Sequence, residues 1–147
     1  MKKTVFLTGA TGNMGAAGLA ELLKKKDLYN IVLLARPSKL NKEKLAYLKD
    51  EESVKIVWGD LLNYDDILKC VTGADIVLHV GGMVSPQADY FPKRTIKTNT
   101  EAAKNIVKAV LAQPNKDEIK VVYIGTVAQT SDRNEPIHWG RTGDPIC

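Results

Sequence analysis

The chain has 147 residues, enough for one domain with a substantial core, and its 44% hydrophobic and 26% charged content is typical of globular proteins. The formal net charge of +4 comes from scattered lysines, and the densest run, Lys24-Lys25-Lys26, has no aromatic residues interleaved, so we expect no nucleic-acid partner. With no signal peptide and no long apolar run, the sequence favours a cytoplasmic protein without a membrane partner.

The cysteines and histidines argue against disulfides, a catalytic thiol and a metal site. Cys70 and Cys147 are the only cysteines, and neither has a neighbouring histidine, so neither a disulfide framework nor a thiol nucleophile is expected. The two histidines lie far apart in the sequence and give no metal-binding spacing. We therefore expect no metal ligands in this chain.

Short apolar runs alternate along the chain with segments of helical period. We expect strands at 4–7, 31–35, 54–58, 75–80 and 119–124. Helices are expected at 15–26, at 39–49, after an N-cap at Asn63, and from 93 or 95 to 112, the last with a core stripe of Ala103, Ile106, Val107 and Val110. The segment 81–92 is expected to be a loop.

Strands that alternate with helices form right-handed βαβ units and a parallel sheet covered on both faces. The pattern predicts an α/β fold of the Rossmann type, with three αβα layers and about five parallel strands in the order 3-2-1-4-5. In that order the carboxyl ends of the first and fourth strands lie beside the switch point, where a ligand binds. Residues 1–130 are predicted to form this domain, and residues 131–147 a loop that follows it.

The run from 8 to 15 carries three glycines directly after the first expected strand, and it opens the first expected helix. A dinucleotide-binding fingerprint requires this context. Gly9 is expected to allow the tight turn, Gly12 to let the backbone approach a pyrophosphate, and Gly15 to let helix and strand pack closely. N–H groups at the helix start would face the phosphates. The expected cofactor contacts of this run are Gly9, Thr11, Gly12, Asn13, Met14 and Gly15.

Arg36 carries information about which dinucleotide binds. It follows the second expected strand, 21 residues after Gly15 (36 − 15), where an NAD-binding protein places an acidic residue for the ribose 2′-hydroxyl. A guanidinium instead suits a 2′-phosphate, through charge-assisted hydrogen bonds. Ser38 and Lys39 could add to the same anion site. We prefer NADP(H) to NAD(H) as the cofactor, although Arg36 could also be a solvated arginine at the start of a loop.

Four further segments come in the order of a known family. Gly59-Asp60-Leu61 follows the third expected strand, His79-Val80-Gly81-Gly82 ends the fourth, Asn99 lies in the long helix, and Val122-Tyr123-Ile124-Gly125-Thr126 ends the fifth. Together with the glycine turn, they make the chain from Lys3 to about Thr130 resemble the extended and atypical short-chain dehydrogenase/reductases, the NAD(P)-dependent epimerase/dehydratase group.

The resemblance implies a role for each of these segments. The cofactor contacts that it implies are Asp60, Leu61, Val80, Gly81, Gly82, Asn99 and Gly125. Thr126 stands where the family has its catalytic serine or threonine. The implied substrate is a small molecule with a carbonyl or a secondary hydroxyl, such as a nucleotide sugar.

The same residues have simpler interpretations that the sequence leaves open. Asp60 could serve only a turn, and His79, inside an apolar strand, is more typical of a hydrogen-bonded core histidine than of a catalyst. Gly81 and Gly82 could serve only a turn as well. Asn99 could be a surface amide, and Thr126 an ordinary hydroxyl at a strand end.

The family's chemistry depends on a Tyr-x-x-x-Lys pair, whose tyrosine exchanges the proton of the substrate hydroxyl while the lysine lowers the tyrosine's pKa. The pair is absent from this chain. The five tyrosines, at 29, 47, 64, 90 and 123, are followed four residues later by Leu33, Glu51, Leu68, Arg94 and Val127. In the family the pair follows the substrate-side loop that 131–147 would begin. We therefore expect the chain to be the N-terminal part of a longer enzyme and to be inactive alone.

Two functions remain open on the sequence. The first is the cofactor domain of an epimerase, dehydratase or carbonyl reductase. The second is a non-catalytic NADP(H)-sensing module, since some atypical family members lack the catalytic pair. In both cases we expect an uncovered apolar sheet face near the fourth and fifth strands, and therefore a homo-oligomer.

Overall fold

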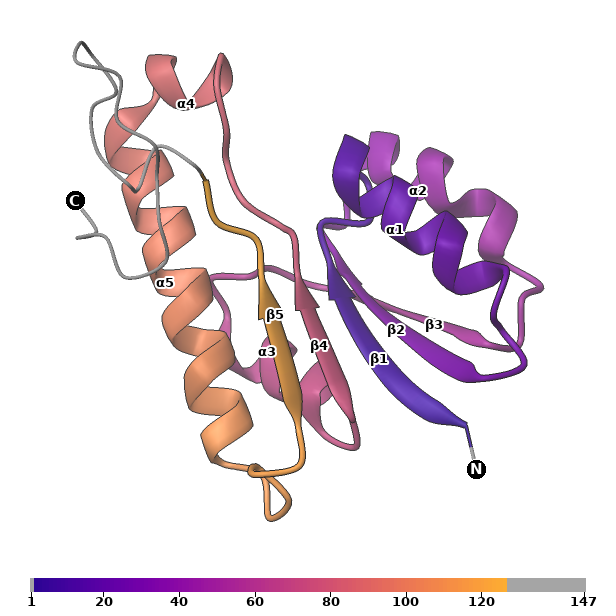
Figure 1. Cartoon of the computed structure of the whole chain (residues 1–147). Helices are drawn as coiled ribbons and strands as arrows, with labels where there is room; N and C mark the ends of the chain where they lie inside the picture. Colours follow the sequence, from indigo (N-terminus) through magenta and orange to yellow (C-terminus); the bar gives the residue numbers. More distant parts are fainter. Residues whose placement is uncertain (1, 127–147) are drawn as a thin grey trace, which may run out of the picture.

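The computed structural model describes residues 2–126. The elements of this part follow in the order β1 (Lys3–Thr8), α1 (Asn13–Leu23), β2 (Tyr29–Ala35), α2 (Lys39–Leu45), the 3₁₀ turn η1 (Ala46–Leu48), β3 (Val54–Trp58), α3 (Tyr64–Val71), β4 (Ile76–His79), α4 (Gln87–Tyr90), α5 (Pro92–Leu111) and β5 (Lys120–Tyr123). The strands form one parallel sheet in the order β3-β2-β1-β4-β5 (Figure 1). The predicted Rossmann-type α/β fold and its strand order are confirmed.

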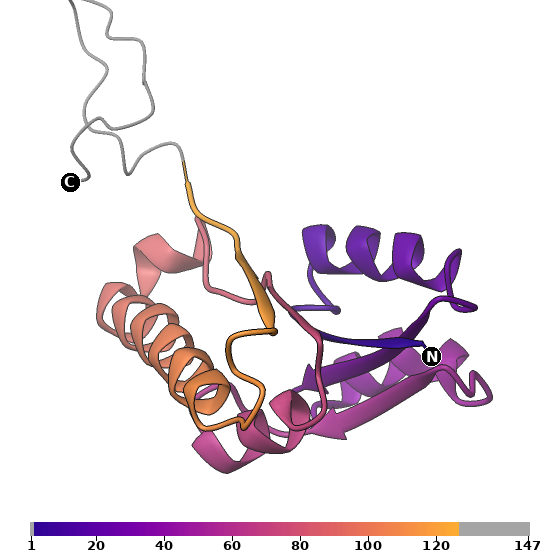
Figure 2. The ribbon, with the colours of Figure 1, turned by 60° about the horizontal axis from the view of Figure 1, so that its bottom comes forward.

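Two apolar clusters hold the helices on opposite faces of the sheet, as Figure 2 shows for α1 and α3. Successive side chains of a strand point to opposite faces, so β1 contributes to both clusters. The cluster under α1, α2 and η1 contains Leu7, Leu19, Leu33, Leu45 and Leu48. The cluster under α3 and α5 contains Phe6, Ile67, Val71, Val77 and Ile106. Because both faces of β1 are covered, its end is rigidly placed between the two layers.

Several helix assignments differ from expectation. The helix expected at 39–49 divides into α2 and η1, and α1 begins at Asn13, two residues before the expected start. α1 ends at Leu23 and not at Lys26, because the N–H groups of Lys25 and Lys26 bond to carbonyls three residues back and tighten the chain into a turn. The expected loop at 81–92 contains the single helical turn α4, which is too short to leave a periodic signal. The expected N-cap at Asn63 is confirmed, since its side chain accepts hydrogen bonds at the start of α3.

The core stripe of α5 is partly the expected one, since Ile106 and Val110 are buried as expected while Ala103 is only half-buried. Its buried residues are Ala102, Ile106, Ala109 and Val110. Val107 is 53% exposed, so its assignment to the core was wrong. α5 packs against α3, and this contact selects the face that carries Ile106. Apolar residues occupy two adjacent faces of α5, so the periodic pattern alone could not choose between them.

The side chain of Thr8 joins β1 to the end of β4. Its Oγ1 accepts the backbone N–H of Val80 at 3.1 Å and that of Gly81 at 2.9 Å, and lies 2.8 Å from Nδ1 of His79. Thr8 is fully buried and His79 is 3% exposed. These bonds tie the strand ends together at the point where the ligand was expected.

The Thr8 contacts also fix the protonation of His79. The two N–H donors occupy both lone pairs of the Thr8 hydroxyl, so we assign its proton to Nδ1 of His79. The imidazole is then neutral, with its own proton on Nε2. Burial lowers the pKa of His79, which favours the same neutral form. His79 is thus a hydrogen-bonded core histidine, the simpler of its two interpretations.

This arrangement predicts a pH-dependent stability. Since burial lowers the pKa of His79 below its ordinary value of 6.5, the unfolded chain binds the imidazole proton more readily than the folded chain does. Below 6.5 the unfolded state therefore holds more protons, and the free energy of unfolding falls as the pH falls. The contribution of His79 is at most about 1.4 kcal/mol per pH unit.

Urea denaturation between about pH 7.5 and about pH 5 measures this effect. The variant His79→Asn keeps an acceptor for the Thr8 hydroxyl but cannot titrate, so it should lose less stability over the same range. An identical pH dependence in the two proteins would contradict the assigned role of His79.

Candidate functional site

The glycine turn and the end of β4 touch through their backbones. Gly9 has a φ of +76°, which favours glycine, and a Cβ at Gly9 would lie 2.8 Å from both Cα and N of Gly81. A Cβ at Gly81 would lie 3.0 Å from Oγ1 of Thr8 and 3.1 Å from Cδ1 of Leu61. The expected tight turn at Gly9 is present, and Gly9, Gly81 and Leu61 meet at the carboxyl ends of β1, β4 and β3.

The other two glycines of the turn differ from each other. Gly15 is buried, and a Cβ there would overlap the carbonyl of Gly9, so α1 can pack on the turn only with glycine at this position. Gly12 is exposed, and a Cβ there would lie 3.4 Å from the Gly9 oxygen. The backbone at Gly12 is therefore accessible to a ligand from outside.

The start of α1 lacks the capping groups of its neighbours. Gly12 provides no side-chain cap, and the first turn of α1 has no acidic residue. By contrast, Ser38 caps α2, and Asn63 caps α3 by accepting the N–H groups of Asp65 and Asp66. Unpaired N–H groups at the positive end of a helix form a site for an anion. Of the residues expected here, Thr11 is half-buried, and Asn13 and Met14 are exposed.

Arg36 and Asp60 lie after β2 and β3, at the same edge of the sheet. Arg36 is exposed, and its carbonyl accepts the side-chain amide N–H of Asn41 at 3.0 Å. Asp60 is exposed too, and its Oδ1 accepts the N–H of Leu62 at 2.9 Å. Asp60 therefore does form a turn, and its exposed carboxylate also faces the solvent where a ligand could reach it.

Asn99 anchors the segment that follows β4. Its Oδ1 accepts the N–H of Met83 at 2.8 Å, and its Nδ2 donates to the Met83 carbonyl at 3.0 Å. A Cβ at Gly82 would lie 3.2 Å from the same Oδ1. Asn99 is thus not a free surface amide: it holds the backbone of Met83, next to Gly82, against α5.

The residues that follow β5 lie beside the carboxyl end of β4. The N–H of Ile124 donates to the carbonyl of His79 at 3.2 Å, so Gly125 and Thr126 follow beside the end of β4. The Tyr123 ring lies against His79, with centroids 5.5 Å apart. Gly125 and Thr126 are both exposed. The expected loop at 131–147 lies outside the described residues.

Three residues that shape this edge were not predicted from the sequence. Thr8 was read as part of the glycine motif, although its hydroxyl joins the strand ends. Asn105 on α5 donates to the carbonyls of Leu61 and Leu62, and the ammonium of Lys44 on α2 donates to the carbonyl of Thr11 at 3.0 Å. These contacts join residues more than 30 positions apart, and no local pattern marks them.

The part of the chain that the structure describes holds neither a candidate metal cluster nor a helix suited to a membrane. Within residues 2–126, no group of three or more His, Cys, Asp and Glu side chains could hold a metal ion. Across the same residues, no helix has the length and apolar character that crossing a membrane requires.

Curated proteins of known activity resemble most of this chain. The chain is 32% identical to the UDP-glucose 4-epimerase of Rickettsia bellii (strain RML369-C) and 30% identical to that of Rickettsia akari (strain Hartford), in each case over 128 residues. Both matches cover 84% of this chain and 36% of the relative. The chain thus spans little more than a third of the length of these relatives.

Solved structures share the fold. Pen from Bacillus thuringiensis has 25% identity and a TM-score of 0.68, with 76% of this chain and 35% of that chain covered. The dTDP-glucose 4,6-dehydratase of Bacillus anthracis, solved in complex with NAD, has 14% identity and a TM-score of 0.76, with 99% of this chain and 44% of that chain covered. WbmH from Bordetella bronchiseptica, solved with NAD⁺, has 23% identity and a TM-score of 0.67, with 88% and 41% covered.

A family model settles the relationship. The model described as the NAD dependent epimerase/dehydratase family matches residues 5–144, nearly the whole chain. Its match includes the glycine turn, both strand ends that Thr8 joins, and Asn99. The chain therefore belongs to the NAD dependent epimerase/dehydratase family.

Proposed function

We propose that this chain is the cofactor-binding part of an NAD(P)-dependent epimerase, dehydratase or carbonyl reductase that acts on a nucleotide sugar. The observation that carries the proposal is the uncapped start of α1 beside the backbone contact of Gly9 and Gly81. That arrangement offers an anion N–H groups and a surface without side chains. The nucleotide-sugar substrate is inferred from the names of the Rickettsia relatives.

The residues fit a dinucleotide along the whole strand-end edge. The pyrophosphate would lie on the N–H groups that begin α1, next to exposed Gly12. Arg36 and Asp60 would contact the adenosine half, while Val80, Gly81 and Gly82 would line the path toward the nicotinamide. Asn99 would act through Met83 by holding that path in place. When bound, the cofactor supplies hydride acceptance and donation.

Thr126 would donate a hydrogen bond to the substrate oxygen at the nicotinamide end. Its support is the position of Gly125 and Thr126 beside the end of β4, together with the family pattern at the end of β5. Proton exchange at that oxygen needs a group such as the tyrosine of a Tyr-x-x-x-Lys pair, which these 147 residues do not contain. We therefore expect this chain to bind cofactor without turning over substrate, and we place it in the cytoplasm on the sequence grounds above.

NADP(H) is the cofactor that we favour. Arg36 presents an exposed guanidinium just after β2, and its carbonyl is held by the N–H of Ser38 at 2.8 Å and by Asn41. A guanidinium in this position matches a 2′-phosphate. NAD(H) is the alternative, since the dehydratase and WbmH were solved with it. The sensing module has no support among the relatives, whose names describe enzymes.

Replacing Arg36 tests this preference. The variant Arg36→Ala should bind NADPH about tenfold more weakly, because one charge-assisted hydrogen bond is worth roughly 1.4 kcal/mol or more. Its affinity for NADH should change less than about twofold. Arg94→Ala, which removes an exposed arginine from α5, is the matched control. Fluorescence titration of both reduced cofactors measures the effect, and an unchanged NADPH affinity in Arg36→Ala would refute the assignment.

We also propose that the chain self-associates through β5. Val122 and Ile124, on the sheet face opposite α5, are 46% and 40% exposed, and Val121 and Tyr123 are exposed on the other face. Contiguous apolar side chains on an edge strand favour association with a second copy.

Sedimentation velocity over a range of concentrations tests this proposal. The unmodified chain should form dimers or larger species, and Val122→Lys should shift it toward monomer, because a lysine on this face must stay solvated. Val107→Lys, on the exposed face of α5, is the control and should have no effect. A monomer at every concentration, or dissociation by Val107→Lys alone, would rule out association through β5.

A further inference from the structure

Two asparagines on α5 hold the backbone of loops at two different strand ends. Asn99 bonds to the backbone of Met83, which follows β4. Asn105, further along the helix, donates through its Nδ2 to the carbonyl of Leu61 at 3.2 Å and to that of Leu62 at 3.3 Å, both in the loop that follows β3. A side-chain amide has two N–H donors, so these bonds use both of them. A single helix therefore contacts both loops.

The loop after β3 is a tight turn from Asp60 to Asn63. The N–H of Asn63 donates to the carbonyl of Asp60 at 3.0 Å, and the N–H of Leu62 donates to Oδ1 of Asp60 at 2.9 Å. These bonds close the turn, and half-buried Asn105 supplies donors to both carbonyls between its ends. Asn105 thus fastens the middle of the turn to α5.

Two other contacts fix the same turn. The Cδ1 of Leu61 would lie 3.1 Å from a Cβ at Gly81, and the Leu61 side chain packs on the apolar cluster under α3 and α5. From α3, Oδ2 of Asp66 accepts the N–H of Asp60 at 3.2 Å. The position of Asp60, whose side chain is exposed, is therefore set jointly by α3, α5 and the end of β4.

Loss of the Asn105 amide would affect one loop and not the other. Without it, the two carbonyls that face α5 would have no donor there, so the turn would move outward to reach water. Asp60 would move with the turn, because it lies in it. The loop after β4 would stay in place, because Asn99 holds it separately.

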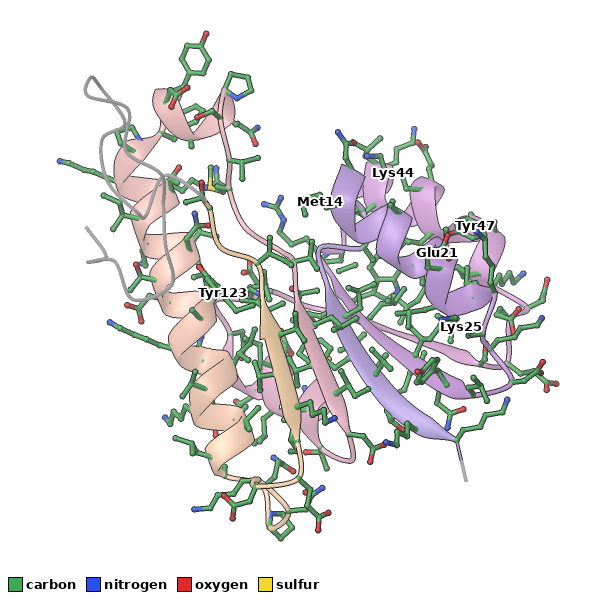
Figure 3. All side chains as sticks on the ribbon, viewed as in Figure 1. Met14, Glu21, Lys25, Lys44, Tyr47 and Tyr123 are labelled. Carbon is green, nitrogen blue, oxygen red and sulfur yellow. The ribbon has the colours of Figure 1, made fainter. Side chains whose placement is uncertain are left out.

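α5 does not belong to the layer that carries the glycine turn's helix. Figure 3 shows α5 on the side of the molecule where Tyr123 lies, with Met14 at the start of α1 on the other side. The two layers have separate apolar clusters. A substitution on α5 should therefore change the loops after β3 and β4 while leaving the start of α1 in place.

We propose that Asn105 is a positioning residue for the adenosine half of the cofactor, so that α5 sets both halves of the dinucleotide through its two asparagines. The inference rests on the proposed function, because that function assigns Asp60 to the adenosine half. Asn105 does not touch the cofactor: it acts through Leu61 and Leu62, whose turn presents Asp60. Asn105 and Asn99 should therefore have separable effects on the two halves of the ligand.

The test compares NADPH with 2′-phospho-ADP-ribose, which is the same dinucleotide without its nicotinamide. Calorimetric titration of the 147-residue chain gives a dissociation constant for each. Asn105→Ala should weaken both ligands about fivefold, because they share the adenosine half, so the ratio of the two constants stays unchanged. Asn99→Ala should weaken NADPH about fivefold and 2′-phospho-ADP-ribose less than about twofold. NADH and ADP-ribose are titrated in parallel, so the test does not depend on which dinucleotide the chain prefers.

Two further variants separate positioning from stability. Asn105→Asp keeps the size of the side chain, but an ionised carboxylate cannot donate to the two carbonyls, so it should weaken both ligands at least as much as Asn105→Ala. Gln113→Ala is the matched control, since the buried Gln113 amide donates to the Ala109 carbonyl of α5 at 3.0 Å and touches neither loop. It should lower the melting temperature and leave every dissociation constant unchanged.

Several outcomes would overturn the inference. If Asn105→Ala binds all ligands as tightly as the unmodified chain, the turn does not depend on Asn105. If Gln113→Ala weakens binding as much as Asn105→Ala, Asn105 only stabilises α5. If Asn105→Ala weakens only the ligands that contain nicotinamide, the turn does not serve the adenosine half. An unmodified chain that binds none of the four ligands is a different result, and it would refute the proposed function itself.

Discussion

The hydroxyl of Thr8 is the point on which the strand-end edge depends. It accepts the N–H groups of Val80 and Gly81 and donates to His79, and all of these contacts are buried or half-buried. Leaving a buried polar group without its partner costs about 1–3 kcal/mol, so the hydroxyl holds the end of β4 firmly against β1. The backbones of Gly9 and Gly81 can then meet without intervening side chains.

Positively charged groups at the carboxyl ends of the strands come from separate parts of the sequence. The start of α1 contributes its uncapped N–H groups, Lys44 comes from α2, and Arg36 from the end of β2. Each is unremarkable alone, since solvated cations and frayed helix ends are common. Of the two cations, Lys44 is the one that bonds to the glycine turn, through the carbonyl of Thr11, so the proposed anion site rests on this contact and on the uncapped start of α1. A dinucleotide extended along this edge would place its phosphates there.

The sequence predicted the features that local patterns encode, and missed those that depend on packing. The strands, their order, the cap at Asn63 and the turn at Gly9 follow from periodicity, capping chemistry and glycine spacing. The buried face of α5 could not be chosen, because apolar residues line two adjacent faces and the contact with α3 decides between them. Lys44 and Asn105 escaped notice because a lysine or asparagine on a helix is usually solvated, and only the fold brings their partners near.

The proposed function requires a dinucleotide to lie along the ends of β1 and β4. The most direct measurement is an NMR titration of the isotopically labelled chain with NADPH, following backbone amides residue by residue. We expect the largest shifts at Gly9, Gly12 and Gly81, smaller shifts at Arg36, and little change on the exposed face of α5 around Val107. Saturable shifts centred on that face of α5, or no shifts at the glycine turn, would contradict the proposed function.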